Sequence, residues 1–98
     1  MNNVPRLDIF ERAPEILIAS LQNEAIVMHQ ENGNCYNLDG VSTRVYELLE
    51  TPMNLEQLCA MLCREYDVDP ETCRVEVAGL LDELVKEGLL LRKVGARA

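Results

Sequence analysis

The chain has 98 residues, of which 48% are hydrophobic, and its 17 acidic and 9 basic side chains give a net charge of −8. This length corresponds to one domain, and the hydrophobic content is typical of a globular chain rather than a disordered one. No apolar run approaches the ~20 residues of a membrane span, and the first six residues lack the apolar segment of a signal peptide. We therefore expect a cytoplasmic protein without general affinity for membranes or nucleic acids.

Four cysteines raise the question of disulfides or a metal site: Cys35, Cys59, Cys63 and Cys73. Cytosolic thiols stay reduced, so disulfides are not expected. A zinc site usually combines two close pairs of Cys or His, whereas Cys59 and Cys63 form a single pair and His29 is isolated. We favour thiols that act as small hydrophobic side chains, and we expect no metal and no other cofactor. A small metal or redox protein that uses Cys59, Cys63 and Cys73 stays open as an alternative.

The first half of the chain predicts three antiparallel strands. Residues 1–15 contain two prolines and are predicted to be an irregular arm. The β-rich segments that follow are residues 16–21, 25–30 and 34–38. Gln22-Asn23 supplies the first turn. Asn32-Gly33 supplies the second, because a type I′ hairpin turn needs positive φ at both central positions.

The second half predicts three helices with recognisable ends. Asp39 is the expected N-cap of the first helix, and Thr51-Pro52 ends it. Asn54 and Gln57 have the spacing of a capping box at the start of the second helix. Asp69-Pro70 opens the third helix with a cap followed by proline.

The third helix is expected to end at Gly88, after which residues 89–91 continue as a short extended segment. Residues 92–98 are predicted to be a basic, flexible tail. The resulting domain division is an arm over residues 1–15, a folded domain over residues 16–91 and this tail. Tyr46 and Tyr66, at helix ends, are expected to pack in the core.

The predicted fold class is α+β: a three-stranded antiparallel β-meander followed by a three-helix, winged helix-turn-helix-like bundle. A DNA-binding member of this class needs Lys and Arg on its third helix, yet residues 70–87 carry five acids and two bases. Residues 47–87 have a net charge of −8, so we expect no nucleic-acid binding. An acidic winged-helix transcriptional regulator stays open as an alternative.

The sequence contains no catalytic constellation that we can identify. It lacks a glycine-rich phosphate loop and a dinucleotide fingerprint. A Cys–His couple would need His29 beside a thiol. A two-residue turn at Asn32-Gly33 pairs His29 with Tyr36, and pairs Gln30 rather than His29 with Cys35. We therefore expect a protein that is not an enzyme.

A peptide-binding groove is the most specific site that the pattern favours. The third strand would be an edge strand with unpaired backbone groups. One side of the third helix is expected to face the core, and it consists of Cys73, Val77, Leu80, Leu81 and Leu84. An adjacent stripe, which shares Leu81, consists of small and apolar side chains around one arginine. The candidate peptide-binding residues are Asn34, Cys35, Tyr36, Asn37 and Leu38 on the strand and Arg74, Ala78, Leu81 and Val85 on the helix. An extended peptide could add to such an edge as a further strand.

Several segments, in this order and spacing, resemble one family. They are Tyr36-Asn37-Leu38-Asp39-Gly40, Val45-Tyr46-Glu47-Leu48-Leu49, Leu55-Glu56-Gln57-Leu58-Cys59, Tyr66-Asp67-Val68 and Gly88-Leu89-Leu90. Over about residues 16–91 the chain resembles the PqqD-like family, the precursor-peptide recognition elements of ribosomally synthesised peptide pathways (RiPPs). It departs from the family at Tyr46, where many members have Trp.

The resemblance implies a function that agrees with the groove. It implies that the protein binds the leader of a precursor peptide as an added strand between the third strand and the third helix, and delivers it to a maturation enzyme. A stand-alone element of this kind is similar to those of lasso-peptide clusters, where the partner is a leader peptidase; a radical SAM enzyme is the other possible partner. We expect a monomer or a weak dimer.

Overall fold

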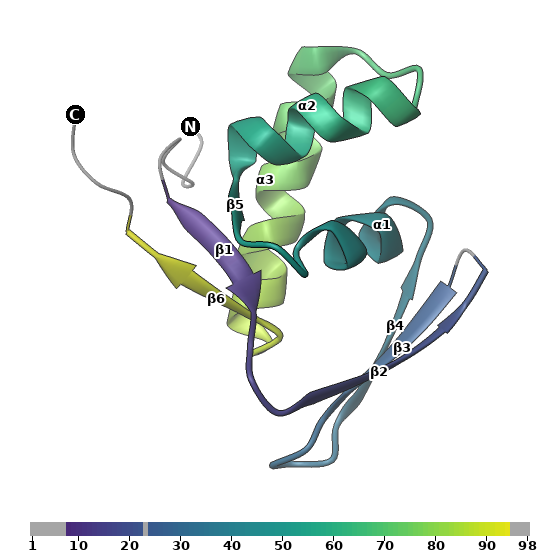
Figure 1. The fold of residues 1–98 in the computed structure, drawn as a ribbon, viewed down its shortest axis with the longest axis vertical. Coiled ribbons are helices and arrows are strands. Elements are labelled where there is room, and N and C mark those ends of the chain that lie inside the picture. The colour runs from purple at the N-terminus through teal and green to yellow at the C-terminus, as the bar shows by residue number, and fades with distance from the viewer. Residues whose placement is uncertain (1–7, 23, 95–98) are drawn as a thin grey trace.

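The computed structural model describes residues 8–22 and 24–94, which form an α+β fold with two small antiparallel sheets and three helices (Figure 1). The strands are β1 (Ile9–Arg12), β2 (Ile16–Leu21), β3 (Glu24–His29), β4 (Cys35–Asp39), β5 (Met53–Asn54) and β6 (Leu90–Lys93). The helices are α1 (Val41–Leu48), α2 (Leu55–Glu65) and α3 (Pro70–Lys86). No helix in the described residues is both long and apolar enough to cross a membrane.

The predicted meander is confirmed as the sheet β2-β3-β4, but its second hairpin has a different register. Cys35 pairs with Met28 and not with Gln30, and five residues (30–34) rather than two connect β3 to β4. Gly33 has a φ of 73°, whereas Asn32 lacks the positive φ that a type I′ turn requires. Instead the Asn32 Oδ1 accepts a hydrogen bond from the backbone N–H two residues on, at 2.9 Å. The predicted register was wrong by two residues, which leaves every side chain on its predicted face.

The helix starts agree with the predicted caps in two of three cases. The capping box of Asn54 and Gln57 is present at α2, and Asp69 caps α3. At α1 the N-cap is Gly40 rather than Asp39, because Asp39 is still part of β4. Gly40 has φ 56° and ψ −127°, a conformation that only glycine adopts easily, and it turns the chain from β4 into α1.

A second sheet, of order β5-β1-β6, corrects two predictions. Residues 9–12 were expected to be irregular, but they form β1 and bury Phe10 completely. Arg92 was expected in a flexible tail, but it belongs to β6, and its Nε donates a hydrogen bond to the Asp8 carboxylate at 2.6 Å. Residues 1–7 of the predicted arm and residues 95–98 of the predicted tail lie outside the described residues.

The core lies where the three helices meet the two sheets, and Tyr46 is its largest fully buried side chain. The Tyr46 hydroxyl donates a hydrogen bond to the Leu89 carbonyl at 3.1 Å. The Arg12 guanidinium lies 5.0 Å from the centre of the Tyr46 ring, which favours a cation–π contact. Tyr46 therefore packs as predicted. The prediction for Tyr66 was wrong, since that side chain is 37% exposed.

Candidate functional site

Strand β4 forms one edge of the meander, as predicted for the third strand. Backbone hydrogen bonds alternate in direction along an antiparallel pair. His29 N–H donates to the Asn34 carbonyl at 3.0 Å, so residues 34, 36 and 38 direct their backbone groups toward β3. Cys35 and Asn37 consequently direct their N–H and C=O groups to the open edge. An extended peptide could pair with both of them.

The inner side of β4 faces α3 across a groove of about 290 Å³. Tyr36 and Leu38 form the strand side of the groove, and one face of α3 forms the other. The residues on this face are Leu80, Glu83 and Leu84 of α3, and Glu87, which caps the C-terminal end of the helix. Leu38 and Leu84 are buried at its base, whereas the two glutamates are exposed at its rim. The groove thus has an apolar floor beside an open strand edge.

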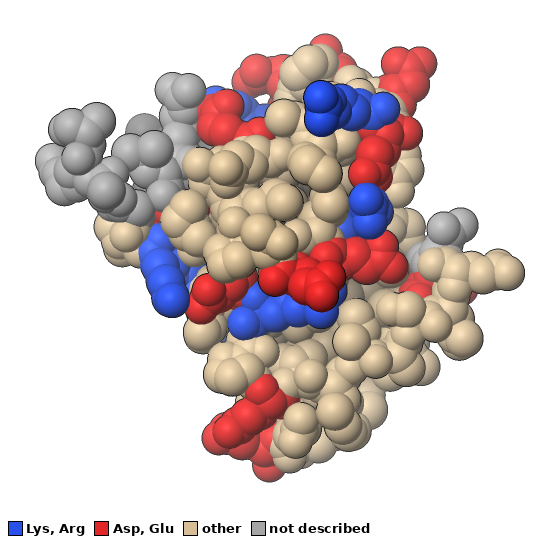
Figure 2. All heavy atoms as spheres, in the orientation of Figure 1, with Lys and Arg blue, Asp and Glu red and all other residues tan. Residues whose placement is uncertain are grey.

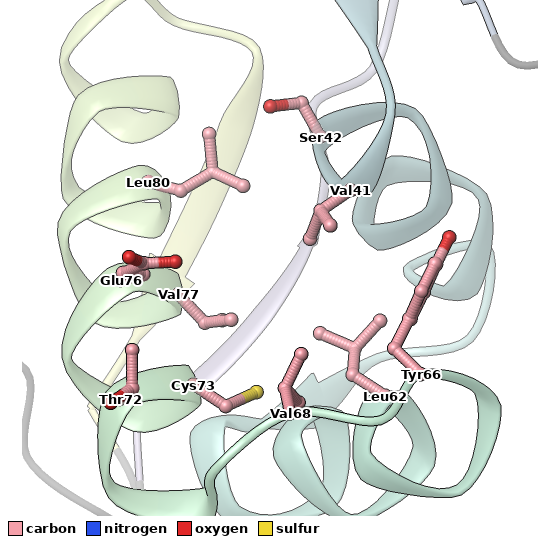
Figure 3. A pocket seen from close by; sticks show the side chains of 10 residues that line it. All are labelled: Val41, Ser42, Leu62, Tyr66, Val68, Thr72, Cys73, Glu76, Val77 and Leu80. Carbon is pink, nitrogen blue, oxygen red and sulfur yellow. The ribbon is translucent and has the colours of Figure 1, made fainter.

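A second cavity, of about 220 Å³, continues from this groove, since Ser42 and Leu80 line both. Figure 3 shows it enclosed by α1, α2, α3 and the segment that joins α2 to α3. Most of its lining is apolar: Val41, Leu62, Tyr66, Val68, Cys73, Val77 and Leu80, together with Ser42, Thr72 and Glu76. An apolar cavity with a few polar groups is suited to hold a large apolar side chain.

The electrostatics of the two cavities disfavour anions. Glu76, Glu83 and Glu87 lie along the side of α3 that borders them. Among the described residues that line the two cavities, none is Lys or Arg. Such a surface repels phosphate and favours a neutral or basic ligand, so it does not support binding to duplex DNA.

The structure brings only part of the predicted peptide site together. Tyr36, Asn37 and Leu38 line the groove, and Cys35 lies on the same strand. Asn34 precedes β4 and is exposed in the connection from β3. These strand positions lie where the sequence placed them, and their contact with a peptide stays a prediction.

The predicted helix stripe lies on another side of α3. At 100° per residue it is centred about 130° from the face of Leu80, Glu83 and Leu84. Arg74 points to α2, where it forms an ion pair of 3.1 Å with Glu56. The others are buried or partly buried against the core: Ala78 (5% exposed), Leu81 (0%) and Val85. The stripe was misassigned because its small and apolar side chains are core-packing residues.

The spacing of the groove-facing residues of α3 is visible in the sequence, but it predicted a side that faces the core. Leu80 and Leu84, with Glu83 and Glu87 between and beyond them, have the spacing of one helix face. A wide apolar surface on α3 includes both the core side and the groove side. Glutamates beside leucines on one side of the helix indicate a surface that is only partly buried. This pattern could have identified the side that borders the groove.

Three of the four thiols lie together between α2 and α3. Burial is the main cause that raises the pKa of Cys73 to about 12, and the neighbouring Cys59 and Cys63 raise it further. Burial also raises the pKa of Cys59. Thiols with raised pKa values stay protonated at neutral pH and are poor nucleophiles. Within residues 8–22 and 24–94, no group of three His, Cys, Asp or Glu side chains is arranged to hold a metal ion.

The fold and the groove define a class of protein: a winged helix-turn-helix-like domain with an open strand edge beside a helix. Residues 24–90 match the family described as coenzyme PQQ synthesis protein D (PqqD). This match spans more than half of the chain, so the chain belongs to the PqqD family. The resemblance of the sequence segments is thereby confirmed. A comparison with curated proteins gave no match.

Two solved structures are similar to the chain over most of its length. One is TbiB1 in complex with the TbiA(beta) leader peptide, with 28% identity, a TM-score of 0.76, and coverage of 82% of this chain and 93% of that one. The other is lasso peptide synthetase B1 complexed with the leader peptide, with 21% identity, a TM-score of 0.74, and coverage of 84% and 96%. At that lower identity the second structure supports the fold alone.

Proposed function

We propose that this protein binds the leader segment of a ribosomally synthesised precursor peptide as an additional antiparallel strand on β4. The observation that carries the proposal is the open edge of Cys35 and Asn37 beside an apolar groove. The likeness to TbiB1, whose structure contains a leader peptide, supports the same ligand class here.

The two parts of the site have separate tasks. Backbone bonds to Cys35 and Asn37 hold any extended peptide, because they do not depend on its side chains. Each bond contributes on the order of 1 kcal/mol. Side chains of alternate peptide residues then enter the groove and the adjoining cavity, where burying one large apolar side chain contributes about 2 kcal/mol. The apolar cavities therefore select the sequence of the leader.

The protein acts in this proposal as a non-catalytic carrier that brings the peptide to a maturation enzyme. The enzyme we favour is a leader peptidase of the lasso-peptide type, and a radical SAM enzyme is the alternative. The first choice rests on the resemblance of the sequence to the stand-alone elements of lasso-peptide clusters. The raised pKa values of Cys59 and Cys73 agree with a binding role, since a nucleophilic thiol needs a lowered pKa.

A fluorescence-polarisation titration with labelled candidate leader peptides, the TbiA(beta) leader among them, tests the proposal. Asn37→Pro removes an N–H that points to the open edge and leaves the β3–β4 bonds intact. We expect it to weaken leader binding by about tenfold, through the lost hydrogen bond and the altered strand edge.

The matched control is Ser20→Pro on the other edge of the same sheet. The β2–β3 register directs the Ser20 N–H away from β3, so this proline also removes an outward-pointing donor. Its leader affinity should equal that of the unmodified protein. Equal affinities for both proline variants, each shown to be folded by circular dichroism, would place the peptide elsewhere.

A further inference from the structure

Three glutamates border the groove and the adjoining cavity without an ion-pair partner. Glu83 and Glu87 line the groove, and Glu76 lines the cavity. All three are exposed, and none forms a salt bridge within residues 8–22 and 24–94. Several glutamates elsewhere in the chain do pair with Arg or Lys: Glu11, Glu47, Glu56 and Glu65.

The position of two of these glutamates is unfavourable for the helix itself. Glu87 is the C-cap of α3, and Glu83 lies one turn before it. The C-terminal end of a helix carries a partial negative charge, so acidic side chains there are repelled. Lys86 is the basic residue of the last turn, but no salt bridge joins it to either glutamate in the described part of the chain. A positively charged ligand in the groove would offset the repulsion.

The strand side of the groove supplies no positive charge to balance the glutamates. It consists of Tyr36, Asn37 and Leu38. The whole sheet β2-β3-β4 lies within residues 13–43, which contain no Lys or Arg. On the side seen in Figure 2, acidic side chains gather over the helices, whereas the part built by β2–β4 shows few charged side chains. The groove is therefore negative along α3 and neutral along β4.

A lysine or arginine side chain matches the two kinds of surface that meet in this groove. Its methylene groups can pack on the apolar floor, where Leu38 and Leu84 are buried. Its charged end can then reach the carboxylates of Glu83 and Glu87 at the rim. Long basic side chains commonly bury their apolar stem while the charged head stays near water. A purely apolar side chain would fill the floor but leave both carboxylates without a partner.

The direction of a bound peptide follows from that of β4. Tyr36, near the start of β4, and Glu87, at the end of α3, both line the groove. Val41, which follows β4, and Glu76 both line the cavity. Strand β4 and helix α3 therefore run in opposite directions, and a peptide antiparallel to β4 runs parallel to α3. Its residues pass the cavity first and the glutamates of the groove afterwards.

The dimensions of helix and strand set the spacing between the two sites. Along α3 the cavity is centred near Glu76 and the groove near Leu84, about 12 Å further at ~1.5 Å per residue. Side chains on one side of an extended peptide repeat every ~6.8 Å. Two such repeats, which correspond to about four residues, span the distance from the cavity to the groove.

We propose that Glu83 and Glu87 select a Lys or Arg of the leader, about four residues after an apolar residue that enters the cavity. This inference rests on the proposed leader binding and specifies which leaders the protein accepts. The strand edge holds the peptide backbone, the cavity holds one apolar side chain, and the two glutamates hold one basic side chain. A leader with Asp or Glu at the basic position is rejected by charge repulsion.

Selection from a displayed library of random dodecapeptides tests the proposal. The two baits are the unmodified protein and a double variant that combines Glu83→Gln with Glu87→Gln. We expect the unmodified protein to enrich peptides with Lys or Arg about four positions after a large apolar residue. The double variant should enrich the apolar residue without the basic one.

Fluorescence polarisation then compares one selected peptide with a version in which Gln replaces its basic residue. We expect the unmodified protein to bind the basic peptide about fivefold more tightly, as for an ion pair at a partly exposed site. This preference should vanish in the double variant. It should also shrink in about 1 M salt, which screens charges beyond ~3 Å.

Asp82→Asn is the matched control for the single variant Glu83→Gln, because each removes one negative charge. Asp82 precedes Glu83 in the sequence, but it lies on another side of α3 and lines neither cavity. The preference for the basic peptide should persist in Asp82→Asn and fall in Glu83→Gln. An equal fall in both variants would assign the preference to the net charge of −8 and overturn the inference.

The remaining outcomes separate this inference from the proposed function. Enriched peptides without a basic residue, or a basic preference that the double variant retains, would overturn selection by Glu83 and Glu87 while leader binding stands. No enriched peptide, or enriched peptides that bind equally well to Asn37→Pro, would refute strand addition at β4 and the inference with it. Circular dichroism verifies that each variant is folded.

Discussion

At the residue scale, replacing either of two glycines by alanine is expected to change the stability of the fold, in opposite directions. Neither Gly40 nor Gly79 has a neighbouring atom within 4 Å of where a Cβ would lie, so alanine fits in both places. Gly40 has a φ of 56°, which side chains rarely adopt, and Gly40→Ala should destabilise the fold by about 1–3 kcal/mol. Gly79 lies inside α3, where alanine is the better helix former, and Gly79→Ala should stabilise the fold by about 0.5–1 kcal/mol.

Urea denaturation of the two alanine variants and the unmodified protein measures both differences. Opposite signs are the expected result. A Gly40→Ala variant as stable as the unmodified protein would mean that the turn from β4 to α1 relaxes, and that the orientation of β4 relative to the helices is not held by this residue.

Residue type and spacing were sufficient to predict the helix cap, but not which of two tyrosines is buried. The capping box of Asn54 and Gln57 depends on near neighbours, so spacing was sufficient to predict it. Tyr46 and Tyr66 both stand near helix ends, but only Tyr46 finds a hydrogen-bond acceptor, Leu89, deep in the core. That partner is 43 residues away in the sequence, and no local pattern indicates it.

At the element scale, α3 shows why the candidate site was only half predictable. Its apolar side chains cover more than one face, and amphipathic spacing identifies such a surface without saying which flank is covered. The packing of α1 and β4 leaves the flank of Leu80 and Leu84 beside the groove and buries that of Ala78 and Leu81. This choice depends on tertiary contacts, which the sequence of the helix does not contain.

Leu80 is the α3 residue shared by the groove and the adjoining cavity, so it should matter most for the leader. Leu80→Lys places a charge between two apolar compartments. We expect leader affinity to fall by about tenfold or more. Isothermal titration calorimetry with the leader measures the change.

Val75→Lys, on an exposed part of the same helix, controls for the added charge. It should bind the leader as the unmodified protein does. If the two lysine variants bound the leader equally well, the groove-facing side of α3 would not contact the peptide.

The β3–β4 hairpin shows a similar limit. Asn32-Gly33 did predict a turn, but the structure uses a five-residue connection with one positive φ, at Gly33. The number of loop residues depends on the twist and pairing of both strands as well as on the turn residues. Because the shift is two residues, Tyr36 and Leu38 still face the helices, and the predicted edge strand survives the error.

At the scale of the whole molecule, the α+β class and the order of strands and helices followed from local patterns. The sheet β5-β1-β6 did not, since it joins the beginning, the middle and the end of the chain. Its strands have two to four residues, too few to show alternation. Parts of the arm and of the tail were wrongly predicted to be irregular, because pairing between strands so far apart in the sequence produces no local sequence pattern.

The distribution of charge over the molecule separates its surfaces. Residues 13–43 contain no Lys or Arg, and the helices are acidic. The part of the molecule formed by residues 13–43 therefore offers no surface suited to a phosphate backbone. What remains there is an open strand edge and an apolar groove. A peptide carrier uses both, whereas a DNA-binding regulator of the same fold would use neither.

Amide hydrogen exchange followed by NMR tests the central claim, that the leader pairs with β4 as an added strand. The N–H groups of Tyr36 and Leu38 already point to β3, and those of Cys35 and Asn37 point outward. On addition of the leader we expect new protection at Cys35 and Asn37, and little change at Ser20 on the opposite edge. Unchanged exchange at Cys35 and Asn37 in the saturated complex would contradict strand addition at β4.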